Sequence, residues 1–345
     1  MIRLRMYLSL LAACFLFAVS CNWDSGGGPM ETFVPVDTVF EYDPQTDTWT
    51  QKASMPTPKG GAAAIAVNGK IYVMSGVNRT TEAFDPVSDT WETKATLPDG
   101  SVSSYTVVGN KAFTIFYTYR TWKMYEYDTV LDLWTEKSTP AREHLDIAAL
   151  GTDIYGSSET VFRKYDTIAD TWSRCANVPV RYYTPVVASG KVFAVGGSNS
   201  MPETPSQMWE YDPVADLWSQ KSDLLIPQDR PDCAVIGNKI YTIRAEWGVT
   251  SPPEIVQEYD TVSDTWTRKL DCPFVPPDCS FSINGKIYLL GRYPGSFVPI
   301  YQFDPVADTW TPRATLTLPI YLTNAGFACE LGGKIYLMGG EYMVF

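Results

Sequence analysis

The chain has 345 residues, a formal net charge of −12, 14% aromatic residues and 19% charged residues. Because nucleic acids and anionic membrane surfaces are themselves negative, this acidic chain is not expected to bind either one directly. The length exceeds what most single hydrophobic cores hold, which favours a repeat architecture.

The first 21 residues have the pattern of a targeting segment that does not belong to the fold. Residues 8–19 form an apolar run that is too short for a membrane span. The stretch Ala18-Val19-Ser20-Cys21 resembles a bacterial lipobox, with Ala18 in place of the usual Leu. We therefore expect a lipoprotein with Cys21 as the lipidated residue, and an ordinary cleaved signal peptide is the alternative.

Residues 22–32 include Gly26-Gly27-Gly28 and are predicted to form a flexible tether, followed by a single domain over residues 33–345. The expected location is the bacterial cell envelope, with the protein lipid-anchored at the outer membrane, in the periplasm or at the cell surface. Secretion is the alternative. The membrane is expected to be contacted only through the N-terminal lipid anchor.

Five cysteines follow the targeting segment, and their spacing is not that of a metal site. Cys272 and Cys279 flank a proline-rich loop and could pair in an oxidising compartment. The chain has one histidine, His144. We therefore expect no metal and no cofactor.

A frame of the form aromatic-Asp-x-x-x-Asp-x-Trp occurs seven times along the chain. Its tryptophans, 38 to 48 residues apart, are Trp49, Trp91, Trp134, Trp172, Trp218, Trp266 and Trp310. Apolar and polar residues alternate before each frame, as in a half-buried strand. Asp followed by Pro or Thr favours a turn, so the frame predicts a β-hairpin. Because the paired aspartates recur at turn positions, we interpret them as scaffold rather than as catalytic or calcium-binding groups.

A second hairpin recurs with the same period. Its clearest copy places residues 62–67 and 70–74 on either side of Asn68-Gly69, a strong hairpin signal. Each unit therefore contains four short antiparallel strands. Four-stranded units of about 40–50 residues are typical of β-propeller blades.

These residues together resemble the kelch repeat, which combines a strand ending in a diglycine, a Tyr-Asp-Pro turn and a Trp shortly afterwards. The diglycine is present as Gly196-Gly197 and Gly339-Gly340 and is lost or reduced in most other units. The resemblance covers roughly residues 33–345. It implies an all-β fold, a seven-bladed kelch-type β-propeller with four antiparallel strands per blade.

The two ends of the chain are predicted to share one blade. Residues 36–49 supply one hairpin and residues 324–340 supply the other, so a composite blade would close the ring and hide both edge strands. The six blades within the chain are predicted at about residues 60–95, 101–138, 144–175, 182–222, 231–270 and 278–314. The repeated Trp is expected to pack between neighbouring blades.

A functional site is expected on one face of the ring. If the strands of a blade are lettered a to d from the axis outward, the variable b–c and d–a connections leave from the same face, where function is usually placed. Arg forks suit carboxylates, and aromatic faces suit sugar rings. The candidate ligand-binding residues of this mouth are Lys59, Arg142, His144, Arg181, Tyr182, Arg230, Arg244, Trp247, Arg292 and Tyr293.

The sequence favours a non-catalytic binding or interaction module, monomeric and outside the cytoplasm, for a protein or carbohydrate ligand; no catalytic residue is assigned. Whether the chain is an enzyme stays open, because the kelch resemblance also brings in enzymes. The copper site of galactose oxidase needs two histidines, and this chain has one. The alternative is therefore a carbohydrate-active enzyme such as a sialic acid mutarotase (N-acetylneuraminate epimerase-like). This alternative rests on an analogy of fold and compartment with that enzyme.

Overall fold

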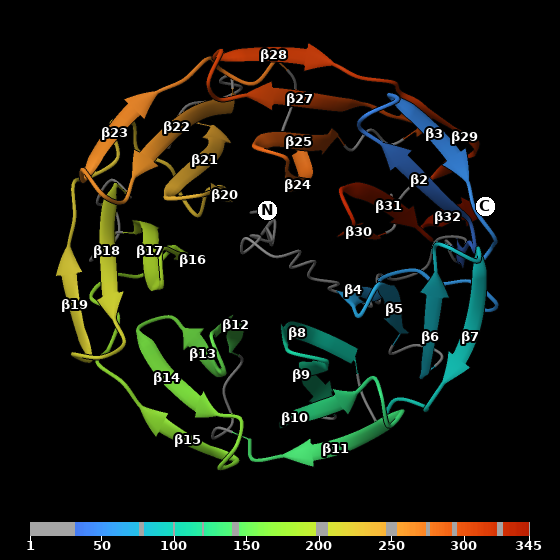
Figure 1. The fold of residues 1–345 in the computed structure, drawn as a ribbon, viewed down its shortest axis with the longest axis horizontal. Helices are drawn as coiled ribbons and strands as arrows, with labels where there is room; N and C mark the ends of the chain where they lie inside the picture. Colours follow the sequence, from blue (N-terminus) through green and yellow to red (C-terminus); the bar gives the residue numbers. More distant parts are fainter. Residues whose placement is uncertain are drawn as a thin grey trace, which may run out of the picture.

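The computed structural model describes residues 32–75, 79–98, 101–118, 121–139, 145–197, 206–245, 254–273, 277–291, 295–322 and 327–344. Within these ranges the chain forms strands and turns without any helix, and hence without a helix able to cross a membrane. Seven four-stranded antiparallel sheets surround a central axis (Figure 1). The predicted seven-bladed, all-β propeller is confirmed.

Six blades follow one another along the chain, each with its first strand nearest the axis. Blade 1 contains β4 (Ala63–Val67), β5 (Lys70–Ser75), β6 (Thr80–Asp85) and β7 (Thr90–Lys94). Blade 2 contains β8 (Ser101–Val108), β9 (Lys111–Thr118), β10 (Thr121–Asp128) and β11 (Leu133–Lys137). Blade 3 contains β12 (Asp146–Leu150), β13 (Asp153–Ser158), β14 (Val161–Asp166) and β15 (Thr171–Arg174). Blade 4 contains β16 (Thr184–Ala188), β17 (Lys191–Gly197), β18 (Gln207–Asp212) and β19 (Leu217–Gln220). Blade 5 contains β20 (Asp232–Ile236), β21 (Lys239–Ala245), β22 (Glu254–Asp260) and β23 (Thr265–Arg268). Blade 6 contains β24 (Pro277–Ile283), β25 (Lys286–Gly291), β27 (Ile300–Asp304) and β28 (Thr309–Pro312).

The seventh blade is the predicted composite blade. Its strands lie in the order β30 (Phe327–Leu331), β31 (Lys334–Met338), β2 (Val39–Asp43) and β3 (Thr48–Gln51), so both chain ends contribute to it. In the register between β2 and β31, Phe40 lies opposite Leu337 and Glu41 lies opposite Tyr336. The ring is therefore closed by hydrogen bonding between the first and last parts of the fold.

Two short ribbons lie outside the seven blades, and the repeat pattern does not predict them. β1 (Thr32–Pro35) pairs with β32 (Glu341–Val344), and β26 (Gly295–Val298) pairs with β29 (Leu316–Leu322). β29 also contacts β32. The segment that precedes β2 is thus hydrogen-bonded to the segment that follows β31, next to the composite blade.

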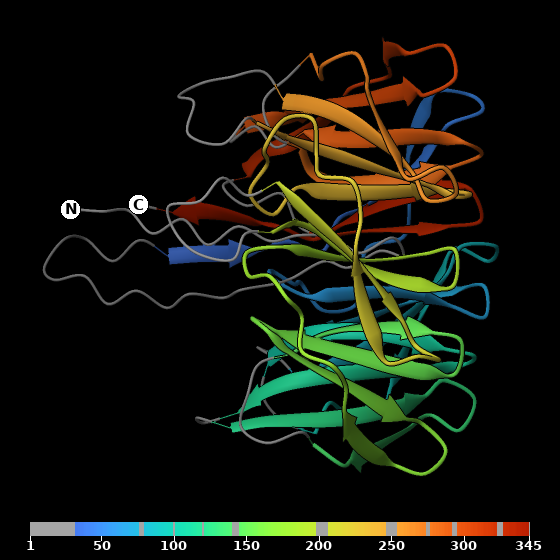
Figure 2. The same ribbon diagram turned by 90° about the vertical axis from the view of Figure 1, so that its left-hand side faces the viewer.

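The ring has two distinct faces, which we call the turn face and the loop face. The a–b and c–d hairpin turns lie on the turn face, at the right of Figure 2 and toward the viewer in Figure 1. The b–c and d–a connections lie on the loop face, from which β1 and β32 also project (Figure 2).

The repeated frame closes each c–d turn and joins each blade to the one before it. The first Asp caps its own turn, as when Asp212 accepts the N–H of Val214 at 2.8 Å. The second Asp has a positive φ in all seven copies, between 49° and 56°. In blade 4 its Oδ1 accepts both the Tyr211 hydroxyl at 2.7 Å and the N–H of Ala176, from the preceding blade, at 2.8 Å. The aspartates are therefore scaffold, as predicted, and the second one also connects blades.

The repeated Trp packs at the same seam, as predicted. Its indole N–H donates to a carbonyl that follows strand d of the preceding blade in all seven copies, at 2.7–3.2 Å. The composite blade takes part equally, because Trp49 donates to Ala314 at 2.7 Å. The same seam chemistry thus repeats around the whole ring.

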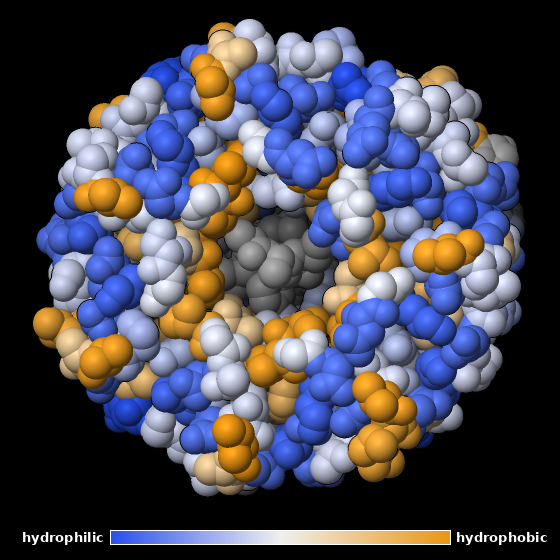
Figure 3. Space-filling view, viewed as in Figure 1, coloured by the Kyte–Doolittle hydropathy of each residue, from blue (hydrophilic) through white to orange (hydrophobic). Residues whose placement is uncertain are grey.

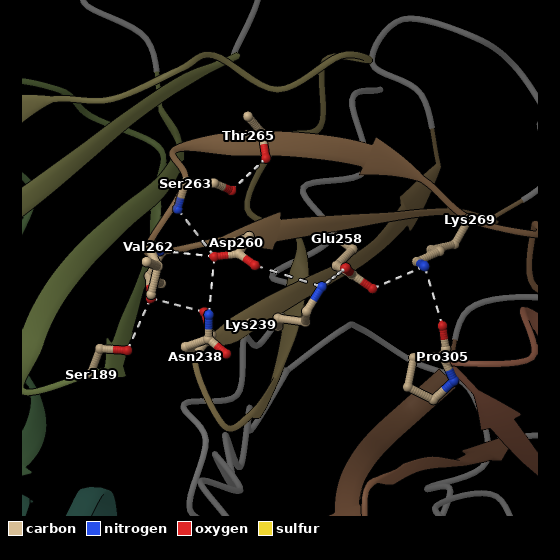
Figure 4. Close-up of polar contacts among 11 residues, drawn as sticks. Ser189, Asn238, Lys239, Glu258, Asp260, Val262, Ser263, Thr265, Lys269 and Pro305 are labelled. Carbon is tan, nitrogen blue, oxygen red and sulfur yellow. Dashed lines mark hydrogen bonds and ion pairs between the residues drawn. The ribbon is translucent and has the colours of Figure 1, made fainter.

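Charged side chains join the two hairpins of a blade near the turn face. In blade 5, Glu258 lies between Lys239 and Lys269, and Lys269 Nζ also reaches the Pro305 carbonyl of blade 6 at 3.2 Å (Figure 4). Blade 3 has the opposite arrangement at the equivalent positions, with Asp153 on strand b and Lys164 on strand c, 2.6 Å apart. The pairing is kept although the signs are exchanged.

The five cysteines of the described chain are buried thiols. Cys272 packs with the blade 5–6 core that contains Tyr241, whereas Cys279 packs with the cluster that contains Phe281 and Leu290. Because the two thiols belong to different cores, the possible Cys272–Cys279 disulfide is not formed.

Replacing Trp218 by Ala is expected to lower the free energy of unfolding by about 3–5 kcal/mol, as large aromatic deletions in cores do. Trp218 is only 7% exposed, contacts Phe162 and Tyr211, and donates to Ala176 at 3.0 Å. Urea unfolding measures the loss. Trp172→Ala is the matched variant: because Trp172 is half-buried, a smaller loss is expected. Equal losses would contradict this packing.

Acid is expected to destabilise the fold through the capping aspartates. Lys191 and the N–H groups of Ala215 and Val214 lower the pKa of Asp212 from 3.8 to about 2. The pKa is also lowered at Asp43, Asp128, Asp166, Asp260 and Asp304. A carboxyl whose folded pKa is depressed stabilises the fold above its unfolded pKa and ceases to do so as the pH falls through the folded value. Urea midpoints should therefore drop between about pH 4 and pH 2. Asp212→Asn should flatten part of that drop.

Candidate functional site

The structure describes half of the predicted ligand-binding residues. Lys59, Arg181, Tyr182, Arg230 and Arg244 have defined positions. The remaining predicted site residues, Arg142, His144, Trp247, Arg292 and Tyr293, and the predicted lipidation site Cys21 lie outside the described residues. The described part of the mouth is therefore formed by the d–a connections that enter blades 1, 4 and 5 and, at Arg244, by the end of strand β21.

Tyr182 and Arg230 occupy equivalent positions in neighbouring blades, each two residues before strand a. Both have positive φ, 58° for Tyr182 and 46° for Arg230. The Arg230 guanidinium lies over the Tyr182 ring, 5.2 Å from its centre. Tyr182 is 36% exposed and the Arg230 side chain 44% exposed. The two connections thus present a stacked cation and aromatic ring to solvent.

The diglycine at the end of β17 allows these two connections to approach each other. A Cβ on Gly196 would lie 2.6 Å from the Gln228 carbonyl, just before Arg230. A Cβ on Gly197 would lie 2.5 Å from Val180 and 3.0 Å from the Arg181 carbonyl. Any larger residue would separate the backbones that carry Tyr182 and Arg230. The diglycine is therefore required for the stacked pair.

Further charges surround the stacked pair. Arg181 lies 3.6 Å from Glu159, and both side chains are exposed. Burial raises the pKa of Asp229, and the positive charges of Arg230 and Arg244 oppose that rise. Asp229 and Glu159 were not among the predicted residues; only the alignment of each connection with its strand a could have indicated Asp229. The two arginines next to the stacked ring thus each have a carboxylate partner, Glu159 for Arg181 at 3.6 Å and Asp229 for Arg230 at 3.9 Å.

Lys59 has a different role from the predicted one. Its side chain is fully buried, and its ammonium donates to Glu82 at 2.7 Å and to Thr80 at 2.8 Å. Gly339 passes directly over the Lys59 carbonyl, where a Cβ would clash. An ammonium held in this way is not available to a ligand. Lys59 instead attaches the d–a connection to strand c of blade 1.

Blade 5 makes the same attachment with neutral amides. Gln228 is equivalent to Lys59, and Gln257 is equivalent to Glu82. The Gln257 amide donates to Gln228 at 3.0 Å, and Gln228 donates to the carbonyls of Arg244 and Ile255 at 2.7 and 2.9 Å. Buried polar groups are therefore satisfied in both blades, with charges in one and amides in the other.

The arrangement at Tyr182 and Arg230 suits binding of an anion beside a ring or planar group. A guanidinium forms two parallel hydrogen bonds to a carboxylate, and a tyrosine face accepts a flat or cationic neighbour. Among the described residues, no group of three or more His, Cys, Asp or Glu side chains is placed to hold a metal ion.

Comparison with known proteins agrees with this geometry. Three segments, residues 33–56, 58–98 and 179–225, match the kelch motif family. The chain carries kelch motifs in these segments. Kelch-like protein 38 of Homo sapiens is 22% identical to this chain, over 63% of the chain and 34% of its own length. Kelch-like protein 35 of Mus musculus is 28% identical, over 58% of the chain and 35% of its own length. The chain thus spans about a third of the length of these relatives.

A solved structure shares the fold of this kelch propeller. That of YjhT matches with a TM-score of 0.53 at 11% sequence identity, over 76% of this chain and 99% of that one. At this identity the likeness concerns the fold alone. A kelch propeller is in general a binding or interaction module, commonly for proteins.

Blade 5 has the Gln228–Gln257 pair where blade 1 has Lys59 and Glu82. Blade 1 should therefore accept Gln at both positions together better than at either one alone. Lys59→Gln or Glu82→Gln alone should each lower the free energy of unfolding by about 3–5 kcal/mol, because each leaves a buried charge without its partner. The double variant should lose much less, because it recreates the amide pair of blade 5 at equivalent positions. Urea unfolding of the four proteins measures the coupling. Additive losses would contradict the equivalence.

Proposed function

We propose that this kelch propeller is a non-catalytic binding module that holds an anionic group of a protein or glycan ligand at its loop face, outside the cytoplasm. The observation that carries the proposal is the exposed Tyr182–Arg230 pair, built on two residues with positive φ. Arg181 extends the cationic surface beside the pair.

The stacked pair does not stabilise the fold enough to explain its own geometry. A bulky residue held at positive φ costs on the order of 1–3 kcal/mol, whereas an exposed cation–π contact contributes about 0.5–1 kcal/mol. The equivalent position before blade 1 is Gly61, which adopts the same conformation at φ 57° without that cost. The presence of Tyr182 and Arg230 at these positions is therefore better explained by a function of their side chains than by a requirement of the backbone. Strain of this kind is typical of functional sites.

The ligand chemistry follows from the charges that remain exposed. Arg181 and Arg230 present guanidinium groups beside an aromatic ring, in a chain whose net charge is −12. A carboxylate next to a ring or planar group satisfies both features. Acidic segments of a protein partner and acidic glycans both carry such groups. The protein partner is favoured, because kelch propellers commonly bind proteins.

A second candidate function, a carbohydrate-active enzyme such as a sialic acid mutarotase, is favoured by one observation. The pKa of Asp229 is raised by burial next to Arg230 and Arg244, and a carboxyl with a raised pKa in a ligand site is suited to acid–base catalysis. Anomer exchange followed by NMR tests this function. Turnover lost in Asp229→Asn would support the enzyme, and binding without turnover would support the module.

The proposed location, a lipid anchor at Cys21 in the bacterial cell envelope, rests on the sequence of residues 1–32. β1 begins at Thr32 on the loop face, so a tether would leave from the same face as the candidate site (Figure 2). Secretion after cleavage remains the alternative. Mass spectrometry of the mature N-terminus distinguishes the two.

Arg230→Ala and Tyr182→Gly are expected to weaken binding of acidic glycans and acidic peptides by about tenfold or more, as loss of a charge-assisted contact does. Glycan and peptide arrays followed by calorimetry measure the loss. Tyr182→Gly should leave the melting temperature unchanged or higher, because glycine relieves the positive φ. Weaker binding with an intact fold would therefore reflect the lost ring.

Arg268→Ala is the matched control. Arg268 lies on the outer strand β23, is about as exposed as Arg230, and pairs with Asp271 at 2.7 Å. Its replacement removes the same charge without altering the mouth, so binding should not change. Equal weakening in Arg268→Ala and Arg230→Ala would indicate a general charge effect and would overturn the proposed site.

A further inference from the structure

The described charges of the candidate site are gathered at blades 3 to 5. Arg181 and Arg230 stand before strand a of blades 4 and 5. Glu159, from blade 3, is the partner of Arg181, and Asp229 is the partner of Arg230. On the turn face, by contrast, apolar patches and polar surface alternate around the whole rim (Figure 3). The Glu159 side chain is 73% exposed and that of Asp229 is 30% exposed, so a ligand that approaches from solvent meets chiefly the charge of Glu159.

The backbone holds Glu159 in a fixed place at the loop face. Ser158 pairs with Val161, so Glu159 and Thr160 form a two-residue turn between β13 and β14. The Thr160 carbonyl accepts the N–H of Val178, at 2.9 Å, from the connection that leads into blade 4. The turn that carries the carboxylate is therefore bonded to the connection that carries the exposed arginine.

The position of Arg181 is fixed in the same way. Val180 and Tyr183, which flank Arg181 and Tyr182, pack in the hydrophobic cluster that contains Phe162 of blade 3. Apolar contacts on both sides of the two exposed residues anchor the backbone between them. The carboxylate and the guanidinium are thus held near each other by the packing of their backbones, and not by their own attraction alone.

The fold does not require a glutamate at this turn. Glu159 has a φ of 48°, a conformation for which Gly, Asn and Asp are the usual residues in two-residue hairpin turns. Its contact with Arg181 is exposed at both ends, and exposed ion pairs contribute little to stability. The presence of Glu159 is therefore better explained by the effect of its charge on the mouth.

A charge in this position distinguishes among anionic ligands. Two unit charges about 4 Å apart in water change a binding constant by about fivefold. A ligand carboxylate at Arg181 comes close to Glu159, because the two side chains are 3.6 Å apart. The like charges oppose binding, whereas a cationic group next to the ligand carboxylate is attracted to Glu159. Both effects favour a ligand that carries the two charges side by side.

We propose that Glu159 is a specificity-determining residue of the loop-face site and that it selects a protein segment in which a cationic side chain lies next to an anionic one. The anionic side chain binds at Arg181 and Arg230, and the cationic one faces Glu159. This inference rests on the proposed function, because it assigns the partner chemistry of the same site. A polyuronate glycan carries carboxylates without such a cation and is therefore disfavoured.

Calorimetry of the full chain with two pentapeptides, acetylated and amidated at their ends, tests the selection. Gly-Glu-Phe-Lys-Gly carries one charge of each sign, and Gly-Glu-Phe-Glu-Gly carries two negative charges. At low ionic strength, the wild-type chain should bind the mixed-charge peptide about fivefold or more tightly than the acidic one. Glu159→Gln should remove most of that preference and keep the wild-type melting temperature. Added salt should reduce the preference of the wild-type chain, because it screens exposed charges.

Glu136→Gln is the matched control. Glu136 lies on the outer strand β11, its side chain is 54% exposed, and its carboxylate lies 3.0 Å from Lys123. Its replacement removes the same charge without altering the mouth, so the preference for the mixed-charge peptide should stay.

The possible outcomes separate this inference from the proposed function. A wild-type chain without the preference, a preference that survives Glu159→Gln, or one that Glu136→Gln removes equally would overturn the inference and leave the proposed function in place. Tighter binding of a galacturonate tetramer than of the mixed-charge peptide would overturn it as well. Binding of none of these probes, or binding that Arg230→Ala does not weaken, would overturn the proposed function and this inference with it.

Discussion

The second aspartate of each repeated frame is the group on which the rest of the ring depends. In all seven frames one of its carboxylate oxygens accepts a backbone N–H of the preceding blade, and in the five frames with Tyr it also accepts that tyrosine's hydroxyl, as Asp264 does with Ser222 at 2.9 Å and with Tyr259 at 2.8 Å. The aspartate also adopts the left-handed conformation that closes the turn. Folding of a hairpin and docking of its neighbour are thus coupled at one atom, and the adjacent Trp adds burial at the same seam. Each c–d turn is therefore bonded to the blade beside it through the aspartate that helps to close it.

How much could be predicted from the sequence depended on repetition. The composite blade followed from counting hairpins, because residues 36–49 and 324–340 each lacked a partner. The β1–β32 and β26–β29 ribbons had no such signal, since each strand occurs once and depends on contacts between distant segments. At the candidate site, residue types indicated cations and rings. Burial could not be predicted, because whether Lys59 meets solvent or Glu82 depends on strand c, 23 residues later.

The equivalences among blades separate structural from functional deviations. Where a blade departs from the repeat for structural reasons, its partner departs with it. Lys59 and Glu82 become Gln228 and Gln257, and the Lys–Glu pairing of blade 5 becomes Asp153 with Lys164 in blade 3. Such paired exchanges keep buried polar groups satisfied and charges matched, which the fold requires. They consequently say little about function.

Two departures are not paired exchanges of this kind. Tyr182 and Arg230 stand where Gly61 shows that glycine fits, and their mutual contact contributes less than their backbone conformation costs. Val and Ile stand at turn tips where Gln45 shows that a polar side chain fits, and they remain in solvent. Gly61 and Gln45 show that the fold accepts, at equivalent positions, a residue with a lower conformational cost or a polar side chain. At the loop face, the exposed Tyr182–Arg230 pair is therefore better explained by a ligand than by the fold.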